Sequence, residues 1–202
     1  MSDAAAFERC LADGGVAVFP SDTVYGLACD PADAGAVERL YRLKRRPLRK
    51  PSAVMFFDLG SALEALPDLG ERTRDAMRGL LPGGLTVLLP NPSRRLPLAC
   101  GDDPASLGIR VPPRLDWACA IRRPVLQSSA NLAGGADPRR LDQVPEEILE
   151  QVDLAVDGGE LPGTPSTVID LRSYEEDRAW SVLRPGVASE GDLASVLDRR
   201  VR

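Results

Sequence analysis

The chain has 202 residues, of which 44% are hydrophobic and 27% are charged, and its formal net charge is −5. This composition is that of an average globular protein and excludes a disordered or fibrous one. The chain contains no histidine, which excludes a Ser-His-Asp triad, a Cys-His pair and a histidine-ligated zinc site. Its negative charge also argues against a protein that coats nucleic acid through a broad basic face.

The N-terminus and the cysteines indicate a cytoplasmic protein. The first residues lack the basic segment and apolar run of a secretory signal, and no apolar run reaches the length of a membrane span. The four cysteines, Cys10, Cys29, Cys100 and Cys119, include no C-x-x-C pair that would favour zinc or dithiol chemistry. We therefore expect reduced thiols, a cytoplasmic location and no membrane partner.

The first half of the chain alternates between helical and strand patterns. Phe7, Cys10 and Leu11 lie at helical spacing, and Gly14-Gly15 would end that helix. The predicted elements, in order, are a helix over 3–13, a strand over 16–19, a helix over 34–44, a strand over 52–57, a helix over 71–81 and a strand over 85–89.

The second half favours strands. The pattern predicts them over 107–111, 124–127, 154–156, 167–171 and 180–183, with helices over 114–122 and 144–151. A last helix begins near Ser189, where Asp192 gives a weak capping arrangement, and Arg199, Arg200 and Arg202 would suit its carboxyl end. This order predicts one α/β domain over 1–202, with an open, twisted, mixed parallel and antiparallel sheet and flanking helices.

Two predicted strands end in small polar residues that suit a polar ligand. Ser21-Asp22-Thr23 follows the first strand, and Gln127-Ser128-Ser129-Ala130-Asn131 ends a later one. Ordinary turn chemistry explains the same residues, because Ser, Thr, Asp and Asn readily satisfy local backbone groups. Each segment alone leaves both interpretations open.

Positive charge gathers at the end of the predicted helix over 34–44. Six cations fall within nine residues there, namely Arg42, Lys44, Arg45, Arg46, Arg49 and Lys50. The compact lysine charge and the planar arginine fork together suit a triphosphate, although a solvated helix end that complements the helix dipole is the alternative. Arg110, in an apolar strand, needs either a ligand carboxylate or an internal Asp or Glu, and Arg184 could reach a phosphate.

Seven segments together resemble the YrdC-like family of threonylcarbamoyl-AMP synthases over nearly the whole chain. They are PSDTVYGL, KRRP, PGGLTVLL, LGIRVP, SSAN, STVID and LRPG. The resemblance implies the short, single-domain form, with a twisted, open α/β fold and a basic ligand cavity. It also implies that the chain makes threonylcarbamoyl-AMP and pyrophosphate from L-threonine, bicarbonate and ATP, for threonylcarbamoyladenosine modification of tRNA.

The resemblance further implies the roles of individual residues. The Lys-x-Arg and Ser-x-Asn pairs of the family match Lys44, Arg46, Ser129 and Asn131, which are implied to be catalytic. The residues implied to bind ATP are Arg46, Lys50, Ser106, Ser129 and Arg184, and those implied to bind threonine are Thr23, Met55, Arg110, Gln127 and Ser166. No protein ligand to a metal is implied, although Mg2+ would bridge the ATP phosphates.

The implied chemistry needs no histidine, because a carbamate made from bicarbonate and the threonine amine is already an anion that can attack the α-phosphate. The unstable product implies a separate threonylcarbamoyl transferase as partner, and tRNA or double-stranded RNA is a further candidate. The chain departs from the family pattern at Ser21, Ser52, Gly84 and Ala133, which bears on substrate affinity and on contacts to the ribose.

Three other functions fit the same pattern less well. A nonsynthetic paralogue would bind nucleotide or double-stranded RNA, a carbamoyl-transfer module of the hydrogenase-maturation type would be part of a longer protein, and a structural module would only bind RNA. The intact Lys-x-Arg and Ser-x-Asn pairs disfavour the first. We expect Lys44 and Arg46 to be exposed, so that alanine at either position abolishes product formation but changes the free energy of unfolding by no more than about 1 kcal/mol.

Overall fold

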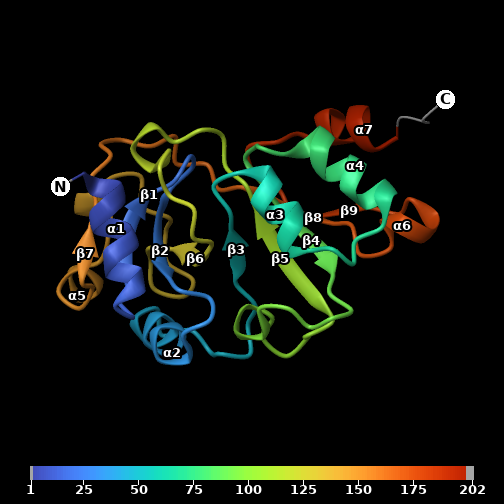
Figure 1. Cartoon of the computed structure of the whole chain (residues 1–202). Coiled ribbons are helices and arrows are strands. Elements are labelled where there is room, and N and C mark those ends of the chain that lie inside the picture. Colours follow the sequence, from blue (N-terminus) through green and yellow to red (C-terminus); the bar gives the residue numbers. More distant parts are fainter. Residues whose placement is uncertain (1, 199–202) are drawn as a thin grey trace.

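Nine strands form one mixed sheet in the computed structural model, which describes residues 2–198 (Figure 1). They are β1 Ala17–Pro20, β2 Tyr25–Cys29, β3 Ala53–Met55, β4 Leu85–Pro90, β5 Ser106–Arg110, β6 Val125–Ser129, β7 Leu154–Ala155, β8 Thr167–Asp170 and β9 Ser181–Arg184. The spatial order is β7-β1-β2-β6-β3-β5-β4-β8-β9. The pairs β1–β7, β3–β5 and β4–β8 are parallel and the other neighbours are antiparallel, so the predicted mixed sheet is confirmed.

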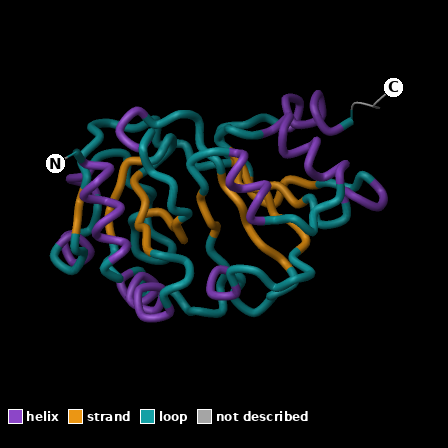
Figure 2. The backbone as a smooth tube through the Cα atoms, in the orientation of Figure 1, coloured by secondary structure: helices purple, strands orange, loops and turns teal. Residues whose placement is uncertain are grey.

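Most helices lie toward the two ends of this sheet, and α3 lies in front of its middle in this view (Figure 1 and Figure 2). They are α1 Asp3–Ala12, α2 Ala34–Leu43, α3 Leu59–Ala65, α4 Glu71–Leu80, α5 Glu146–Leu149, α6 Tyr174–Asp177 and α7 Glu190–Leu197. The predicted cap of the last helix is confirmed, because the Asp192 amide donates to Ser189 Oγ at 3.2 Å. The predicted role of Arg199, Arg200 and Arg202 lies outside the described residues.

The two faces of the sheet differ because side chains alternate along each strand. On β5, Leu107 and Ile109 pack into the main hydrophobic core, whereas Gly108 and Arg110 line a cavity on the opposite face. β4 shows the same alternation, because Val87 packs into the core whereas Thr86 and Leu88 line the cavity. The polar residues that the sequence places between apolar ones in these strands are therefore collected on one side of the sheet.

A smaller apolar cluster lies on the cavity side of the sheet under α1. The rings of Phe7 and Trp117 meet edge to face with centroids 5.4 Å apart, and Phe19 packs 5.5 Å from Phe7. The indole Nε1 of Trp117 donates to the Pro20 carbonyl at 3.1 Å. This contact fixes the end of β1, from which the chain turns into residues 21–24.

The structure differs from the sequence prediction at β2, at two predicted helices that are shorter, and at α3 and α6, which the sequence pattern does not predict. No strand is predicted over β2, since Gly26 and Ala28 have low strand propensity, yet all five of its residues are buried between β1 and β6. A Cβ on Gly26 would lie 2.8 Å from the Phe19 ring, so close packing requires glycine there. The predicted helix over 114–122 is only a 3-10 turn, Asp116–Ala118, and that over 144–151 shortens to α5.

Candidate active site

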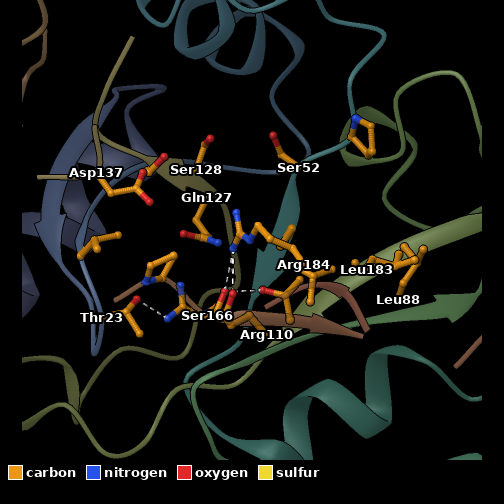
Figure 3. Close-up of a pocket in the computed structure, with 18 of the residues that line it drawn as sticks. Thr23, Ser52, Leu88, Arg110, Gln127, Ser128, Asp137, Ser166, Leu183 and Arg184 are labelled. Carbon is orange, nitrogen blue, oxygen red and sulfur yellow. Dashed lines mark hydrogen bonds between the residues drawn. The ribbon is translucent and has the colours of Figure 1, made fainter. Parts of the chain in front are cut away.

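A cavity of about 310 Å³ lies on the face of the sheet opposite the main core (Figure 3). Its walls come from the turn after β1, the loop after α2, strands β4, β5, β6 and β9, and the segment before β8. The lining includes these predicted site residues: Thr23, Arg46, Arg110, Gln127, Ser129, Ser166 and Arg184. The fold thus brings together residues that are distant in the sequence.

Arg110 is held in the cavity wall by the turn after β1. Its side chain is 3% exposed, and its Nη2 donates to Asp22 Oδ1 at 2.5 Å and to Thr23 Oγ1 at 2.8 Å. Burial raises the pKa of Asp22 and lowers that of Arg110. Among the described residues, Arg110 Nε has no hydrogen-bond partner. The alternative of an internal carboxylate partner is therefore confirmed, and the role of Arg110 toward a ligand carboxylate stays a prediction.

The turn after β1 confirms the turn interpretation of Ser21 and places Thr23 beside the cavity. Ser21 Oγ accepts from the amides of Thr23 and Val24 at 3.2 and 3.3 Å and donates to the Val24 carbonyl at 2.6 Å. This is ordinary side-chain turn chemistry. It directs Thr23 into the cavity, where its hydroxyl meets Arg110.

Arg46 approaches the cavity from the loop after α2. Its Nη2 donates to the Pro51 carbonyl at 2.7 Å, and its guanidinium carbon lies 5.9 Å from the centroid of the Tyr41 ring. Tyr41 also donates to the Lys50 carbonyl at 2.7 Å, which ties the loop to α2. Arg46 Nε is buried without a partner.

Arg184 enters from the edge strand β9. Its Nη2 donates to the carbonyl and to the hydroxyl of Ser166, at 2.9 and 3.3 Å, as the dashed lines in Figure 3 show. The Ser166 hydroxyl in turn lies 3.0 Å from Thr86 Oγ1. Three arginines from three elements therefore converge on one space, an arrangement that suits carboxylate and phosphate groups.

Lys44 stands behind the cavity wall rather than in it. Its side-chain nitrogen donates to the Ser129 carbonyl, to the Asn131 carbonyl at 2.7 Å and to Asn131 Oδ1 at 2.8 Å. The residue is 2% exposed, and burial, with a contribution from the nearby Arg46 charge, lowers the pKa of Lys44 to about 8. The expectation that Lys44 and Arg46 are exposed is wrong, because Lys44 is buried and Arg46 is half-buried. An alanine at position 44 would leave three buried oxygens without their donor, so it would cost more stability than the sequence analysis expects.

Asn131 links the network to the loop that follows β6. Its Oδ1 accepts from Ser129 Oγ at 2.7 Å, and its Nδ2 donates to the Gly135 carbonyl at 2.6 Å and to Asp137 Oδ1 at 3.1 Å. Lys44, Ser129 and Asn131 thus form one hydrogen-bonded unit beside Arg46. Asn131 therefore both closes the turn after β6 and holds Ser129 beside the cavity.

The remaining predicted site residues lie outside the cavity lining. Lys50 is exposed, Met55 is fully buried in the smaller apolar cluster, and Ser106 is buried with a hydroxyl that has no partner. Their predicted roles stay predictions. The polar lining residues that the sequence analysis does not assign to a ligand are Ser52, Thr86, Ser128 and Asp137. The first three fall in or beside recognised segments, whereas no motif marks Asp137.

The described residues offer little for a resident metal. No three His, Cys, Asp or Glu side chains within residues 2–198 gather closely enough to hold an ion. The cavity lining contains one carboxylate, Asp137, and a magnesium ion would therefore depend mainly on the phosphates of a bound nucleotide. No helix in the described part of the chain is long and apolar enough to cross a membrane.

Two solved structures are similar to this chain over most of its length. Sua5 of P. abyssi, crystallised with L-threonine, matches with a TM-score of 0.80 and 26% identity and covers 95% of this chain and 56% of its own. E. coli YciO matches with a TM-score of 0.73 and 27% identity, covering 93% and 91%. This chain thus spans little more than half of the Pyrococcus protein and nearly all of YciO.

Sequence comparisons agree with the structural ones. The threonylcarbamoyl-AMP synthase of Stutzerimonas stutzeri is 36% identical over 181 residues, which is 88% of this chain and 94% of the relative. That of Pyrococcus abyssi is 30% identical over 180 residues, 87% of this chain and 52% of the relative. The family model for Sua5, YciO and YrdC, described as "Telomere recombination", matches residues 9–186. The chain therefore belongs to the Sua5/YciO/YrdC family.

Proposed function

We propose that this chain is an L-threonylcarbamoyl-AMP synthase, which converts L-threonine, bicarbonate and ATP into threonylcarbamoyl-AMP, pyrophosphate and water. The water is released when the threonine amine and bicarbonate form the carbamate. Relatives with this name match most of the chain at 34–36% identity. The observation that carries the proposal is the convergence of Arg46, Arg110 and Arg184 on one cavity, with two buried Nε donors that no protein group satisfies. Such donors suit the carboxylate of an amino acid and the phosphates of a nucleotide.

The proposed roles divide the lining residues between the two substrates. Threonine is bound by Thr23, Arg110, Gln127 and Ser166, and ATP by Arg46, Ser129 and Arg184. The proposal also keeps the roles of Met55 toward threonine and of Lys50 and Ser106 toward ATP, although these three residues lie outside the cavity lining. The similar Pyrococcus structure contains L-threonine, which supports an amino-acid site in this fold. Lys44 and Asn131 act through Ser129, because they are bonded to its carbonyl and its hydroxyl.

The proposed reaction relies on positioning and charge rather than on a protein base. An oxygen of the threonine carbamate attacks the α-phosphorus of ATP, the bond from the α-phosphorus to the bridging oxygen breaks, and pyrophosphate leaves with the electron pair. Arg46 and Arg184 neutralise charge that develops on the phosphates, and Arg110 holds the threonine carboxylate in line. Mg2+ would add charge neutralisation on the phosphates, carried in by the nucleotide.

The product is a mixed carboxylic-phosphoric anhydride and is therefore reactive. The proposal includes its delivery to a separate threonylcarbamoyl transferase that modifies tRNA. Direct contact of this chain with tRNA or double-stranded RNA is a further part of the proposal. The candidate surface is formed by the exposed cations of the segment 42–50, Arg42, Arg45, Arg49 and Lys50.

The test is pyrophosphate release from ATP by the purified chain, with and without L-threonine and bicarbonate. We expect release to require both, and serine or alanine to replace threonine poorly. Bound ATP without any threonine-dependent release would contradict the proposal and favour a nonsynthetic paralogue that binds nucleotide or double-stranded RNA.

The lowered pKa of Lys44 predicts a pH dependence of ATP binding. With a pKa of about 8, Lys44 is cationic below that pH and neutral above it, so a positive charge directly behind the cavity wall is lost as the pH rises. We expect the dissociation constant of ATP, measured by calorimetry, to increase several-fold from about pH 7 to about pH 9. Lys44→Met should abolish this dependence, and equal wild-type affinities at both pH values would contradict it.

A further inference from the structure

Asp137 is a carboxylate in a cavity whose other charged lining groups are arginines. The charged residues of the lining are Arg46, Arg110, Asp137 and Arg184. Among the described residues, no lysine or arginine forms an ion pair with Asp137 within 4.0 Å. The Asp137 charge acts on Lys44 from a distance and favours its cationic form, but no cation within residues 2–198 bonds the carboxylate directly. A carboxylate without a bonded cation would repel a phosphate placed next to it, so we expect the ligand to place a hydrogen-bond donor beside Asp137.

The carboxylate of Asp137 is fixed in position. The Asn131 amide donates to its Oδ1 at 3.1 Å and also to the Gly135 carbonyl at 2.6 Å, which holds the loop between these residues against β6. Asn131 is itself buried and bonded to Lys44. One oxygen of Asp137 thus has a protein donor, and Figure 3 shows the side chain directed into the cavity.

The side-chain amide of Asn131 connects Asp137 to Ser129, which lies in the proposed phosphate site. Asn131 Oδ1 accepts from Ser129 Oγ at 2.7 Å while its Nδ2 donates to Asp137, so the serine hydroxyl and the carboxylate lie on either side of one amide group. In a nucleotide, the ribose is bonded directly to the α-phosphate, and the polar groups of the base lie beyond it. If Ser129 contacts the α-phosphate, the ribose hydroxyls are the nucleotide donors nearest to that contact.

We propose that Asp137 accepts a hydrogen bond from a ribose hydroxyl of the bound nucleotide and makes the site selective for ribonucleotides over deoxyribonucleotides. The inference rests on the proposed function, in which Arg46 and Ser129 face the phosphates. An ionised carboxylate only accepts hydrogen bonds, and carboxylates recognise ribose hydroxyls in this way in dinucleotide-binding folds. The carboxylate also sets the direction of the nucleotide, because a phosphate at the ribose position would meet a like charge.

The test compares the binding of ATP, 2′-deoxy-ATP and 3′-deoxy-ATP to the full chain by calorimetry, without threonine. We expect the wild type to bind ATP about 10-fold or more tightly than at least one deoxy analogue, as a charge-assisted hydrogen bond predicts. In Asp137→Ala, ATP should weaken to the affinity of that analogue, whose own affinity should hardly change. Asp102→Asn, an exposed carboxylate outside the cavity lining, is the matched control and should keep the wild-type ratio.

Two outcomes would overturn the inference. If Asp137→Ala weakens all three nucleotides equally, the carboxylate serves only to support the Asn131 loop. If the mutation abolishes the magnesium dependence of binding and leaves the ratio of ATP to deoxy-ATP affinity intact, the carboxylate is a metal ligand. Because binding is measured without product formation, a chain that discriminates ribose but releases no pyrophosphate would reject the synthase proposal and keep this inference.

Discussion

Arg46→Met is expected to lower threonine-dependent pyrophosphate release by about 100-fold or more. Arg46 is anchored through Nη2 to the Pro51 carbonyl, and its buried Nε has no protein partner. A fixed donor aimed at charge that develops in the transition state contributes about 100- to 1,000-fold in rate. Initial rates at saturating threonine and bicarbonate, over a range of ATP concentrations, measure this loss.

Arg45→Met is the matched control for that loss. Arg45 precedes Arg46 in the same loop, but its side chain is 69% exposed and pairs with Glu147 at the surface. Exposed pairs of this kind contribute about 1 kcal/mol or less to stability. We expect the Arg45 variant to keep nearly full activity. Equal losses in the two variants, or an active Arg46 variant, would show that the cavity position of Arg46 is unimportant.

Arg110→Met is expected to lower the free energy of unfolding by about 3 kcal/mol. The substitution removes the cation that faces the buried carboxylate of Asp22 and leaves that charge uncompensated. Adding Asp22→Asn to the same chain should restore much of the loss, because replacing both members of a buried pair is often nearly neutral. Urea unfolding of the wild type, both single variants and the double variant gives the four free energies.

The pH dependence of the Arg110 variant follows from the same pair. Burial already raises the pKa of Asp22 in the folded wild type, and Arg110 opposes that rise. Without Arg110 the folded-state pKa lies further above the unfolded value, so the protonated carboxyl stabilises the fold at low pH and this contribution is lost as the pH rises through the folded pKa. The Arg110 variant should be closest to the wild type in acid. If the Arg110→Met variant were as stable at neutral pH as the variant that carries both Arg110→Met and Asp22→Asn, this account would be contradicted.

The strands and helices with a clear period could be predicted from the sequence. The helix over 34–44 and the strand over 85–89 appear within one residue of their predicted bounds, because their apolar residues define a single buried face. β2 could not, since its glycine is required by the ring of Phe19, a contact made only in the folded chain. The segment 114–122 packs through Trp117 against two other aromatic rings and makes only one 3-10 turn.

The candidate site could be predicted in composition but not in arrangement. The sequence shows that Lys44 and Arg46 are cations at a helix end. It does not show that Lys44 turns inward to the carbonyls of β6 while Arg46 faces the cavity. The sequence also does not identify the partner of Arg110, because Asp22 is distant in the chain and meets Arg110 only in the fold. Asp137 lies in a loop that contains no motif. Its place in the cavity lining and its hydrogen bond from Asn131 are evident only in the folded chain.

The cavity draws its walls from nearly the whole chain, between Thr23 and Arg184, and no local segment contains it. Its ligands should therefore bind the folded chain and have no equivalent site on the unfolded one. Thermodynamic linkage then makes each substrate a stabiliser of the entire fold, by about 2.7 kcal/mol when its free concentration is about 100 times its dissociation constant. In a cell, the persistence of the folded protein against proteolysis would follow the supply of its own substrates.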